Sequence, residues 1–293
     1  MQNWKNTIDL LTAAQTRLKR VKEHVENTEK QHLKDNVDYT IIAIENIKRD
    51  LKKRRLTIMI KVSNIEVFNF KGALRGMRNP LNSWHRSDSC LCDKNNDDCL
   101  VDNPCGCPKD GDFDEPYFCI GANDLALMKA LYKGGTEHRK YLRQIFVSMD
   151  VLAPLYWWKE ADQYRINVTT NSCSTMHKIH AKEFTLDDFS LEHIDLLKIE
   201  RLGYYPFNHV IEDVIKTLNI AREEYLRTKD KTYWWQMIQL LPSSYNQKRT
   251  VTMNYENVMN MINQRSNHKL DEWRSFVEVL KGLPYVRAIR GEL

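Results

Sequence analysis

The sequence lacks the features that mark membrane, secreted or unstructured chains. Its 293 residues contain no apolar run near the roughly 18 residues of a membrane span. The first segment, residues 1–20, has no apolar core of the kind found in secretory signal peptides. Hydrophobic residues make up 42% of the chain and aromatic residues 10%, which excludes a disordered or collagen-like protein. These absences predict a soluble protein of the cytoplasm.

Several motifs of nucleotide and ester chemistry are also missing. The chain has no phosphate-binding P-loop, no glycine-rich dinucleotide fingerprint and no Gly-x-Ser-x-Gly elbow. The net charge of +5 is modest for this length, so it permits an anionic ligand but does not indicate a nucleic-acid-binding protein. The seven cysteines are an odd number, which suits a reducing compartment better than a disulfide framework.

The first 55 residues contain no glycine or proline and differ from the rest. Apolar residues at helical spacing between Ile8 and Val25 predict a helix, and a second is expected after a break at Lys34–Asn36. The basic run 48–55 is typical of a solvated helix end, with a nucleic-acid contact as the alternative. We therefore expect a helical arm over residues 1–55.

Residues 56–293 are expected to form an α+β domain with a cysteine-rich insertion at 85–118. Near-alternating apolar residues predict a strand within 56–70, and Phe146–Leu152 predict another that ends at Pro154. A helix capped by Asn123 or Asp124 is expected to end at Gly134, and further helices are expected over 155–165, 207–228, 231–240, 255–266 and 269–281. The stretch Gly72–Pro80, with glycines beside arginines, is expected to be a flexible loop, either an anion contact or a surface turn.

The insertion is a candidate metal site. Cys90, Cys92, Cys105 and Cys107 form two Cys-x-Cys pairs, and four thiolates from a short loop can hold zinc. The usual spacing within each pair is two residues, so a reduced loop without metal is the alternative.

Polar side chains recur on the predicted helix 255–266. Asn257, Asn260 and Asn263 follow one another every third residue, and Arg265 comes next. Asparagine is a poor helix former, and its amide suits the edge of a pyrimidine or flavin ring. A polar outer helix face is the alternative explanation.

This region resembles the C-terminal signature of the flavin-dependent thymidylate synthases. The matching residues are Leu241-Pro242, Tyr245, Gln247, Thr252, Asn254, Met259-Asn260, Arg265 and His268, and His138 and Pro154 precede them in the family's order. The family's Arg-His-Arg-x7-Ser motif falls on Gln163-Tyr164-Arg165 and Cys173. The first Arg and the His of that motif are therefore missing, and so are several phosphate-binding arginines, for which Lys248 or Arg249 are candidate substitutes.

The resemblance implies a homotetramer that uses FAD and methylenetetrahydrofolate to methylate C5 of dUMP or a related pyrimidine nucleotide. It implies that Arg265 is the catalytic residue and polarises the pyrimidine. The implied cofactor-binding residues are His138, Arg165, Ile166, Asn254, Asn260 and His268. The implied substrate-binding residues are Gln163, Cys173, Ser174 and Arg265.

Other hypotheses remain open at this point. The missing arginines fit a changed substrate, for instance in a phage-related nucleotide-modifying enzyme, or a non-catalytic descendant that binds a nucleotide or a partner. The basic helix end and the cysteines fit a zinc-stapled nucleic-acid-binding protein. Cys173 is either a nucleophile or an inert residue that replaces the family's serine.

Overall fold

The computed structural model describes residues 2–25, 37, 40, 41, 44, 60–92, 117–194 and 207–292. The chain divides into two compact units: residues 1–58 with 192–194, and residues 59–191 with 195–293. The described residues of the first unit before residue 58 are helical, residues 192–194 are not, and the second unit contains the sheets.

The first unit contains helix α1, Gln2–Val25. Leu11 and Leu18 are half-buried on this helix, whereas Leu10 is exposed. Residues 37, 40, 41 and 44 are also helical, and Ile44 is buried. The predicted helix near residues 8–25 is confirmed; the predicted break and the basic run 48–55 lie outside the described residues.

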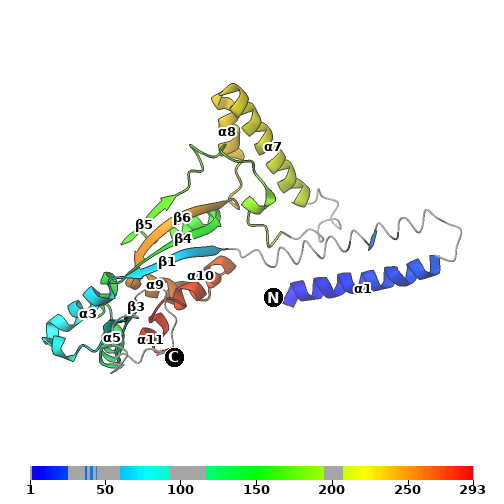
Figure 1. Cartoon of the computed structure of the whole chain (residues 1–293). Coiled ribbons are helices and arrows are strands. Elements are labelled where there is room, and N and C mark those ends of the chain that lie inside the picture. The colour runs from blue at the N-terminus through cyan, green and yellow to red at the C-terminus, as the bar shows by residue number, and fades with distance from the viewer. Residues whose placement is uncertain are drawn as a thin grey trace. The chain divides into compact units, whose positions relative to one another are not determined.

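The second unit is built on a four-stranded sheet in the order β1-β4-β6-β5 (Figure 1). Its strands are β1 (Lys61–Phe68), β4 (Phe146–Pro154), β5 (Val168–Ser172) and β6 (Asn246–Asn254). All neighbouring strands are antiparallel, and alternate residues of β4 are buried, from Val147 to Ala153. An antiparallel sheet with helices packed on it is an α+β fold, so the predicted class is confirmed.

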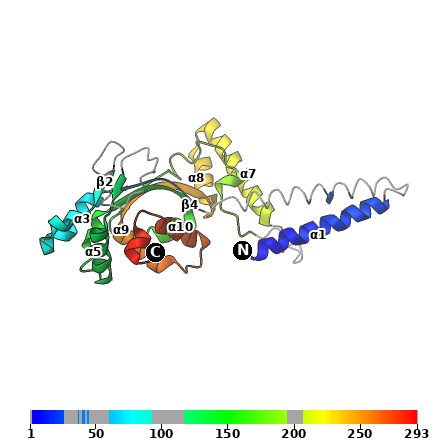
Figure 2. The same cartoon turned by 60° about the horizontal axis from the view of Figure 1, so that its bottom comes forward.

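Helices α9 and α10 lie beneath this sheet (Figure 2). The helices that contribute to the same core are α3 (Phe70–Arg78), α5 (Ala122–Lys133), α6 (Leu155–Ala161), α9 (Tyr255–Arg265), α10 (Asp271–Lys281) and α11 (Val286–Arg290). The centre of the core is aromatic, since the Trp157 ring centroid lies 4.7 Å from that of Trp273 and 5.3 Å from that of Phe276. Large buried rings contribute much of the apolar area that stabilises such a core.

Helices α7 (Phe207–Thr228) and α8 (Lys231–Leu240) form a pair with its own core. Leu218 of α7 and Met237 of α8 are fully buried in that core, together with Phe184 and Phe189 from the preceding loop. The side chain of Asp230 caps α8 by accepting the backbone N–H of Thr232 at 2.9 Å. Both predicted helices are confirmed at their predicted bounds.

The expected flexible loop at residues 72–80 was wrong, because α3 and the 3-10 helix η1 (Asn79–Leu81) occupy it. Phe70, Ala73, Leu74 and Met77 form a buried stripe at helical spacing. The glycines allow close packing: a Cβ on Gly72 would overlap Oδ1 of Asn69, and one on Gly76 would lie 2.5 Å from Oε1 of Gln144. These glycines are there for close packing and not for flexibility.

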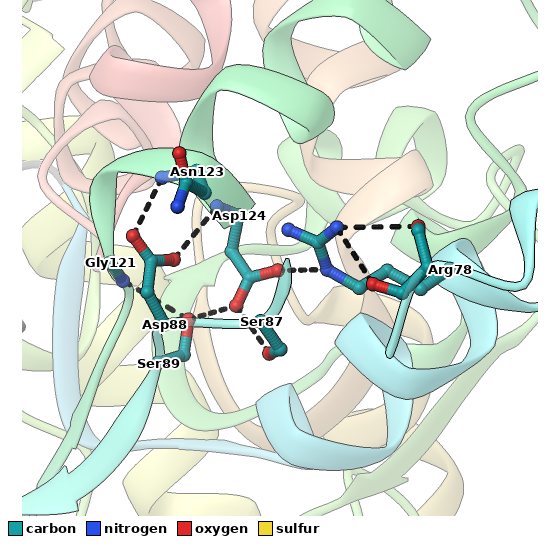
Figure 3. A network of polar contacts seen from close by, with 8 residues as sticks. Arg78, Ser87, Asp88, Ser89, Gly121, Asn123 and Asp124 are labelled. Atoms are coloured by element: carbon teal, nitrogen blue, oxygen red, sulfur yellow. Dashed lines mark hydrogen bonds and ion pairs between the residues drawn. The ribbon is translucent and has the colours of Figure 1, made fainter. Parts of the chain in front are cut away.

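Arg78 at the end of α3 is a buried partner of Asp124 rather than an anion contact (Figure 3). Its Nε lies 2.5 Å from Oδ1 of Asp124, and the hydroxyls of Ser87 and Ser89 donate to Oδ2 at 2.7 and 2.6 Å. Burial alone would raise the pKa of Asp124, but these hydrogen bonds and the positive charge of Arg78 lower it overall.

The N-terminus of α5 is capped from outside the helix. Oδ1 and Oδ2 of Asp88 accept the backbone N–H groups of Asp124 and Asn123 at 3.0 and 2.8 Å. The expectation that Asn123 or Asp124 would be the cap was therefore wrong, because Gly121 precedes the helix and Asp88 supplies the carboxylate.

The described ends of the cysteine-rich insertion form a short hairpin. β2 (Cys90–Cys92) pairs with β3 (Tyr117–Cys119), and Cys90 lies opposite Cys119. Cys119 is in a disulfide bond, which differs from the expectation that the cysteines are reduced. Cys105 and Cys107 lie outside the described residues.

Candidate functional site

A cluster of five polar and aromatic side chains surrounds the end of α9. This Glu160 cluster consists of Glu160, Tyr164, Arg265, His268 and Trp273. Oε2 of Glu160 lies 3.3 Å from Nη1 of Arg265, 3.1 Å from Nε1 of Trp273 and 3.1 Å from Nε2 of His268. Three elements meet here, since Glu160 is on α6, Arg265 on α9 and Trp273 on α10.

Arg265 is held on several sides. Its Nε donates to the hydroxyl of Tyr164 at 2.9 Å. Its guanidinium carbon lies 4.9 Å from the ring centroid of Trp273 and 5.5 Å from that of Tyr164. The side chain is 18% exposed, so the cation is confined but reachable. Aromatic faces and a carboxylate together hold a guanidinium in one orientation, as a donor to a developing oxyanion must be held.

His268 has a defined hydrogen-bonding role. Its Nδ1 accepts the backbone N–H of Leu270 at 3.2 Å. A neutral ring therefore carries its proton on Nε2 and donates it to Glu160. The predicted residues Arg265 and His268 are thus brought together, and the carboxylate of Glu160 joins them.

A second polar group lies where β6 meets β5 and α6. Arg249 contacts Asp162 at 2.6 Å, donates to Oε1 of Gln247 at 3.0 Å and stacks 4.2 Å from the ring centroid of Trp158. Nε2 of Gln247 in turn donates to the carbonyl oxygen of Cys173 at 2.7 Å. Gln247 therefore links Arg249 to the segment of the predicted substrate-binding residue Cys173.

Lys248 is paired on the sheet. Its Nζ lies 2.8 Å from Oδ2 of Asp150, which also accepts from Asn64 at 2.9 Å, while Thr250 donates to Oδ1 at 2.6 Å. Hydrogen bonds from Lys248, Thr250 and Asn64 lower the pKa of Asp150 to about 2. Both candidate substitutes for the missing phosphate-binding arginines, Lys248 and Arg249, are therefore paired with carboxylates.

The other side of α9 carries a separate polar group. Nη2 of Arg139, the residue after His138, lies 2.9 Å from Oε1 of Glu256. Oε2 of Glu256 is buried without a hydrogen-bond partner in the described structure. Asn260, one turn later, is half-buried, and its side chain makes no hydrogen bond to another described residue.

The other asparagines of this region have structural roles. Asn254 is buried and caps α9 by accepting the N–H of Asn257 at 3.0 Å. Asn257 donates to the carbonyl oxygens of Ile166 and Asn167, and Asn263 accepts from Arg290 at 2.7 Å. Nδ2 of Asn257 and Oδ1 of Asn263 therefore make contacts within the fold, whereas the amide of Asn260 has no hydrogen-bond partner among the described residues.

Most of the remaining predicted residues are exposed. His138, Gln163, Arg165, Cys173 and Ser174 are exposed, and Ile166 is 79% exposed. Nε of Arg165 donates to the carbonyl oxygen of Asp162 at 3.1 Å. Oγ of Ser174 accepts the N–H groups of Met176 and His177, which forms a turn. Cys173 is an exposed free thiol.

The predicted residues do not converge on one point within the chain. Asn260 and Arg265 are five positions apart on α9, which turns them by about 140° at about 100° per residue. Asn260 therefore faces the side of Glu256 and Arg139, whereas Arg265 faces α6 and α10.

Sequence reasoning missed Glu160 and Trp273, which complete the cluster. Glu160 is the one acidic residue in the largely aromatic and apolar segment 155–161, and this isolated acid was the available sign of a functional residue. Its partners lie more than a hundred positions away, so only the fold brings them together.

A separate open cleft of about 460 Å³ lies along α7. Its lining residues are Glu183, Phe184, Leu186, Glu212, Ile215, Lys216, Asn219, Ile220 and Glu223. None of the predicted site residues lines this cleft.

The described residues do not support the zinc site. Among them, no group of three or more His, Cys, Asp or Glu side chains can hold a metal ion. Cys90 is half-buried in β2, Cys92 ends that strand, and Cys105 and Cys107 are not described. Within the described part of the chain, no helix is long and apolar enough to cross a membrane.

Similarity to known proteins was found between structures and not between sequences. No protein-family model matches the sequence, and no curated protein sequence matches it. The structure of thymidylate synthase X from Helicobacter pylori with FAD and dUMP is similar, with 15% identity and a TM-score of 0.50 over 78% of this chain and 95% of that chain. A second structure of the flavin-dependent enzyme from Helicobacter pylori, also with FAD and dUMP, has 14% identity and a TM-score of 0.49 over 79% of this chain and 100% of that chain. The chain therefore has a fold similar to that of the flavin-dependent thymidylate synthases, as the resemblance predicted.

Proposed function

We propose that the chain is a flavin-dependent methyltransferase of the thymidylate synthase type, acting at C5 of dUMP or a related pyrimidine nucleotide. The observation that carries the proposal is the Glu160 cluster at the end of α9. It holds Arg265, the residue to which the resemblance gives the catalytic role, in a fold similar to that of an enzyme solved with FAD and dUMP.

Arg265 supplies the polar chemistry of the proposed reaction. A guanidinium that donates to a carbonyl oxygen of uracil stabilises the negative charge that develops there when C5 becomes nucleophilic. Tyr164, Trp273 and Glu160 fix the guanidinium, so little reorganisation is needed during the reaction.

FAD is the cofactor that the proposal requires, and it would supply the hydride that completes the methyl group, with methylenetetrahydrofolate as the carbon donor. The available amide of Asn260 fits a ring edge that carries both donors and acceptors. His138 is exposed and precedes Arg139, the partner of Glu256, and Arg165 and Ile166 are exposed on a different segment. These residues would hold the flavin.

The chain departs from the family at the positions that bind the nucleotide in the family. Tyr164 stands where the family has a histidine, and it is bound to Arg265. Arg249 and Lys248 are paired with Asp162 and Asp150. These departures support a substrate related to dUMP but held differently, with Gln163, Cys173 and Ser174 as the proposed nucleotide contacts.

We also propose that the active protein is a homo-oligomer. Asn260 and Arg265 lie about 140° apart around α9, so they point to different neighbours within one chain. Two copies of the chain can bring an Asn260 side and an Arg265 side together. Light scattering on the purified protein measures the assembled mass, and a monomer that turns over nucleotide would contradict this part.

Flavin binding and pyrimidine turnover test the proposal together. The purified protein is expected to show the visible absorbance of oxidised flavin, or to acquire it when FAD is added. With methylenetetrahydrofolate and a reductant, it is expected to release tritium from C5-labelled dUMP or a close relative. Arg265→Ala should slow this release by at least about 100-fold, as the loss of one oxyanion donor does.

The matched control is Arg227→Ala on α7, which removes an arginine from an exposed ion pair with Glu224. It should leave turnover unchanged. A colourless protein that takes up no FAD would contradict the proposed enzyme and favour a non-catalytic descendant. Unchanged turnover in a folded Arg265→Ala protein would contradict the role of Arg265.

A further inference from the structure

Glu160 helps to hold Arg265 in place, but the proposed function does not explain why this residue is a charged carboxylate. In a site that stabilises negative charge, a carboxylate beside the arginine also has a cost, because it offsets the positive charge of that arginine. Yet Oε2 of Glu160 lies 3.3 Å from Nη1 of Arg265. The carboxylate therefore needs a function of its own.

The hydrogen bonds of Glu160 are all on one side of the carboxylate. Arg265, Trp273 and His268 contact Oε2, and no described residue donates a hydrogen bond to Oε1. Each oxygen of an ionised carboxylate has two acceptor positions. The side chain of Glu160 is 33% exposed, so a ligand can reach it.

Arg265 also has an unused hydrogen-bond donor. Its Nε and Nη1 donate to Tyr164 and Glu160, and its Nη2 makes no hydrogen bond to a described residue. A free acceptor on Glu160 thus accompanies a free donor on Arg265. The matching ligand carries a ring N–H next to a carbonyl oxygen, which is the cyclic amide edge of uracil.

We propose that Glu160 is a specificity-determining residue: its Oε1 accepts the ring N–H of the pyrimidine while Arg265 donates to the adjacent carbonyl oxygen. This inference rests on the proposed function and deepens it. It means that Glu160 on α6, and not a residue that binds the phosphate, selects a ring with an N–H donor. The pair discriminates strongly because a ligand without the N–H leaves a charged acceptor unpaired.

The test compares two probes on the full-length protein loaded with FAD. Isothermal titration gives the Kd of dUMP and of N3-methyl-dUMP, which lacks the ring N–H. The wild-type protein should bind dUMP at least about 10-fold more tightly, the range expected for one hydrogen bond to a charged group. Glu160→Gln should reduce this ratio to a few-fold, because its acceptor is uncharged, and Glu160→Ala should abolish it.

Lys159→Gln is the matched control, since Lys159 is exposed on the same helix. It should keep the wild-type ratio. Circular dichroism and melting confirm that each variant is folded, and Glu160→Gln, which preserves the shape of the side chain, keeps the test decisive if Glu160→Ala does not fold.

The outcomes separate the two proposals. A wild-type protein that binds neither probe contradicts the proposed function itself. A wild-type protein that binds both probes equally, or Glu160 variants that keep the full ratio, would overturn only the role of Glu160. If the Glu160 variants keep the full ratio, a steric contact elsewhere in the site excludes the methyl group.

Discussion

Arg78 and Arg265 show how differently the fold uses two arginines that the sequence analysis linked to anions. Arg78 is almost fully buried and forms an ion pair with Asp124 inside the protein. Arg265 is partly exposed and keeps Nη2 available. A buried ion pair contributes to stability only while both partners are present, because a lone buried charge is costly.

Arg78→Met should therefore destabilise the protein strongly. It leaves Asp124 buried with two serine donors and no cation, which is expected to lower the free energy of unfolding by about 3–5 kcal/mol. Urea denaturation followed by tryptophan fluorescence measures the change. Arg227→Met, which breaks an exposed ion pair on α7, is the control and should leave the denaturation midpoint unchanged.

The pH dependence of the same measurement has a defined sign. The pKa of Asp124 is lowered on folding, so its contribution is present above the ordinary value of 3.8 and is lost as the pH falls through the lower folded value. The difference between wild type and Arg78→Met should shrink in acid. A difference that grows as the pH falls would contradict the pairing.

Helix α3 shows what a pattern of residues can and cannot reveal about an element. The long helices 207–228 and 231–240 were predicted at their observed bounds because their apolar residues recur at helical spacing. Glycines 72 and 76 hid the same spacing in α3, because glycine is usually a helix breaker. Strand β6 was not predicted, because Gln247 and Arg249 are polar at the positions in step with buried Val251 and Met253, which hides the alternation of a strand.

Alanine at the two glycines of α3 should have opposite effects. Gly76→Ala meets the end of the Gln144 side chain, which can rotate away, so the better helix propensity should raise stability by about 0.5–1 kcal/mol. Gly72→Ala meets Asn69, whose Nδ2 is bound to the carbonyl oxygen of Gln144 at 2.8 Å, so it should lower stability. Thermal melting of the two variants measures both effects, and equal shifts would contradict this account of the packing.

At the scale of the whole molecule, the fold was predictable and the arrangement of the candidate site was only partly so. The resemblance rested on residues of β6 and α9, and the structure agrees with it at the level of fold. The sequence placed Arg265 and His268 on the right helix end but gave no sign that Glu160 and Trp273 would meet them. It also gave no sign that Asn260 would face away from Arg265, because a linear motif does not show which residues share a helix face.

The two described cores of the second unit contain no residue before Ile60. A chain that begins at residue 56 should therefore keep a cooperative melting transition and the same FAD uptake as the full chain. Removal of residues 286–293 is the contrasting variant, because it takes Val286 and Ile289 out of the core and should abolish that transition. A chain from residue 56 that melts without cooperativity would show that the first unit is needed for the second to fold.

The two-sided character of α9 has a consequence for how such a protein changes over generations. Asn260 and Glu256 lie on one side of the helix, and Arg265 lies on the other, so substitutions on one side leave the contacts of the other intact. The proposed flavin side and the proposed pyrimidine side can thus diverge at different rates. A lineage that lost one ligand would still inherit a folded helix with the other half of its chemistry in place.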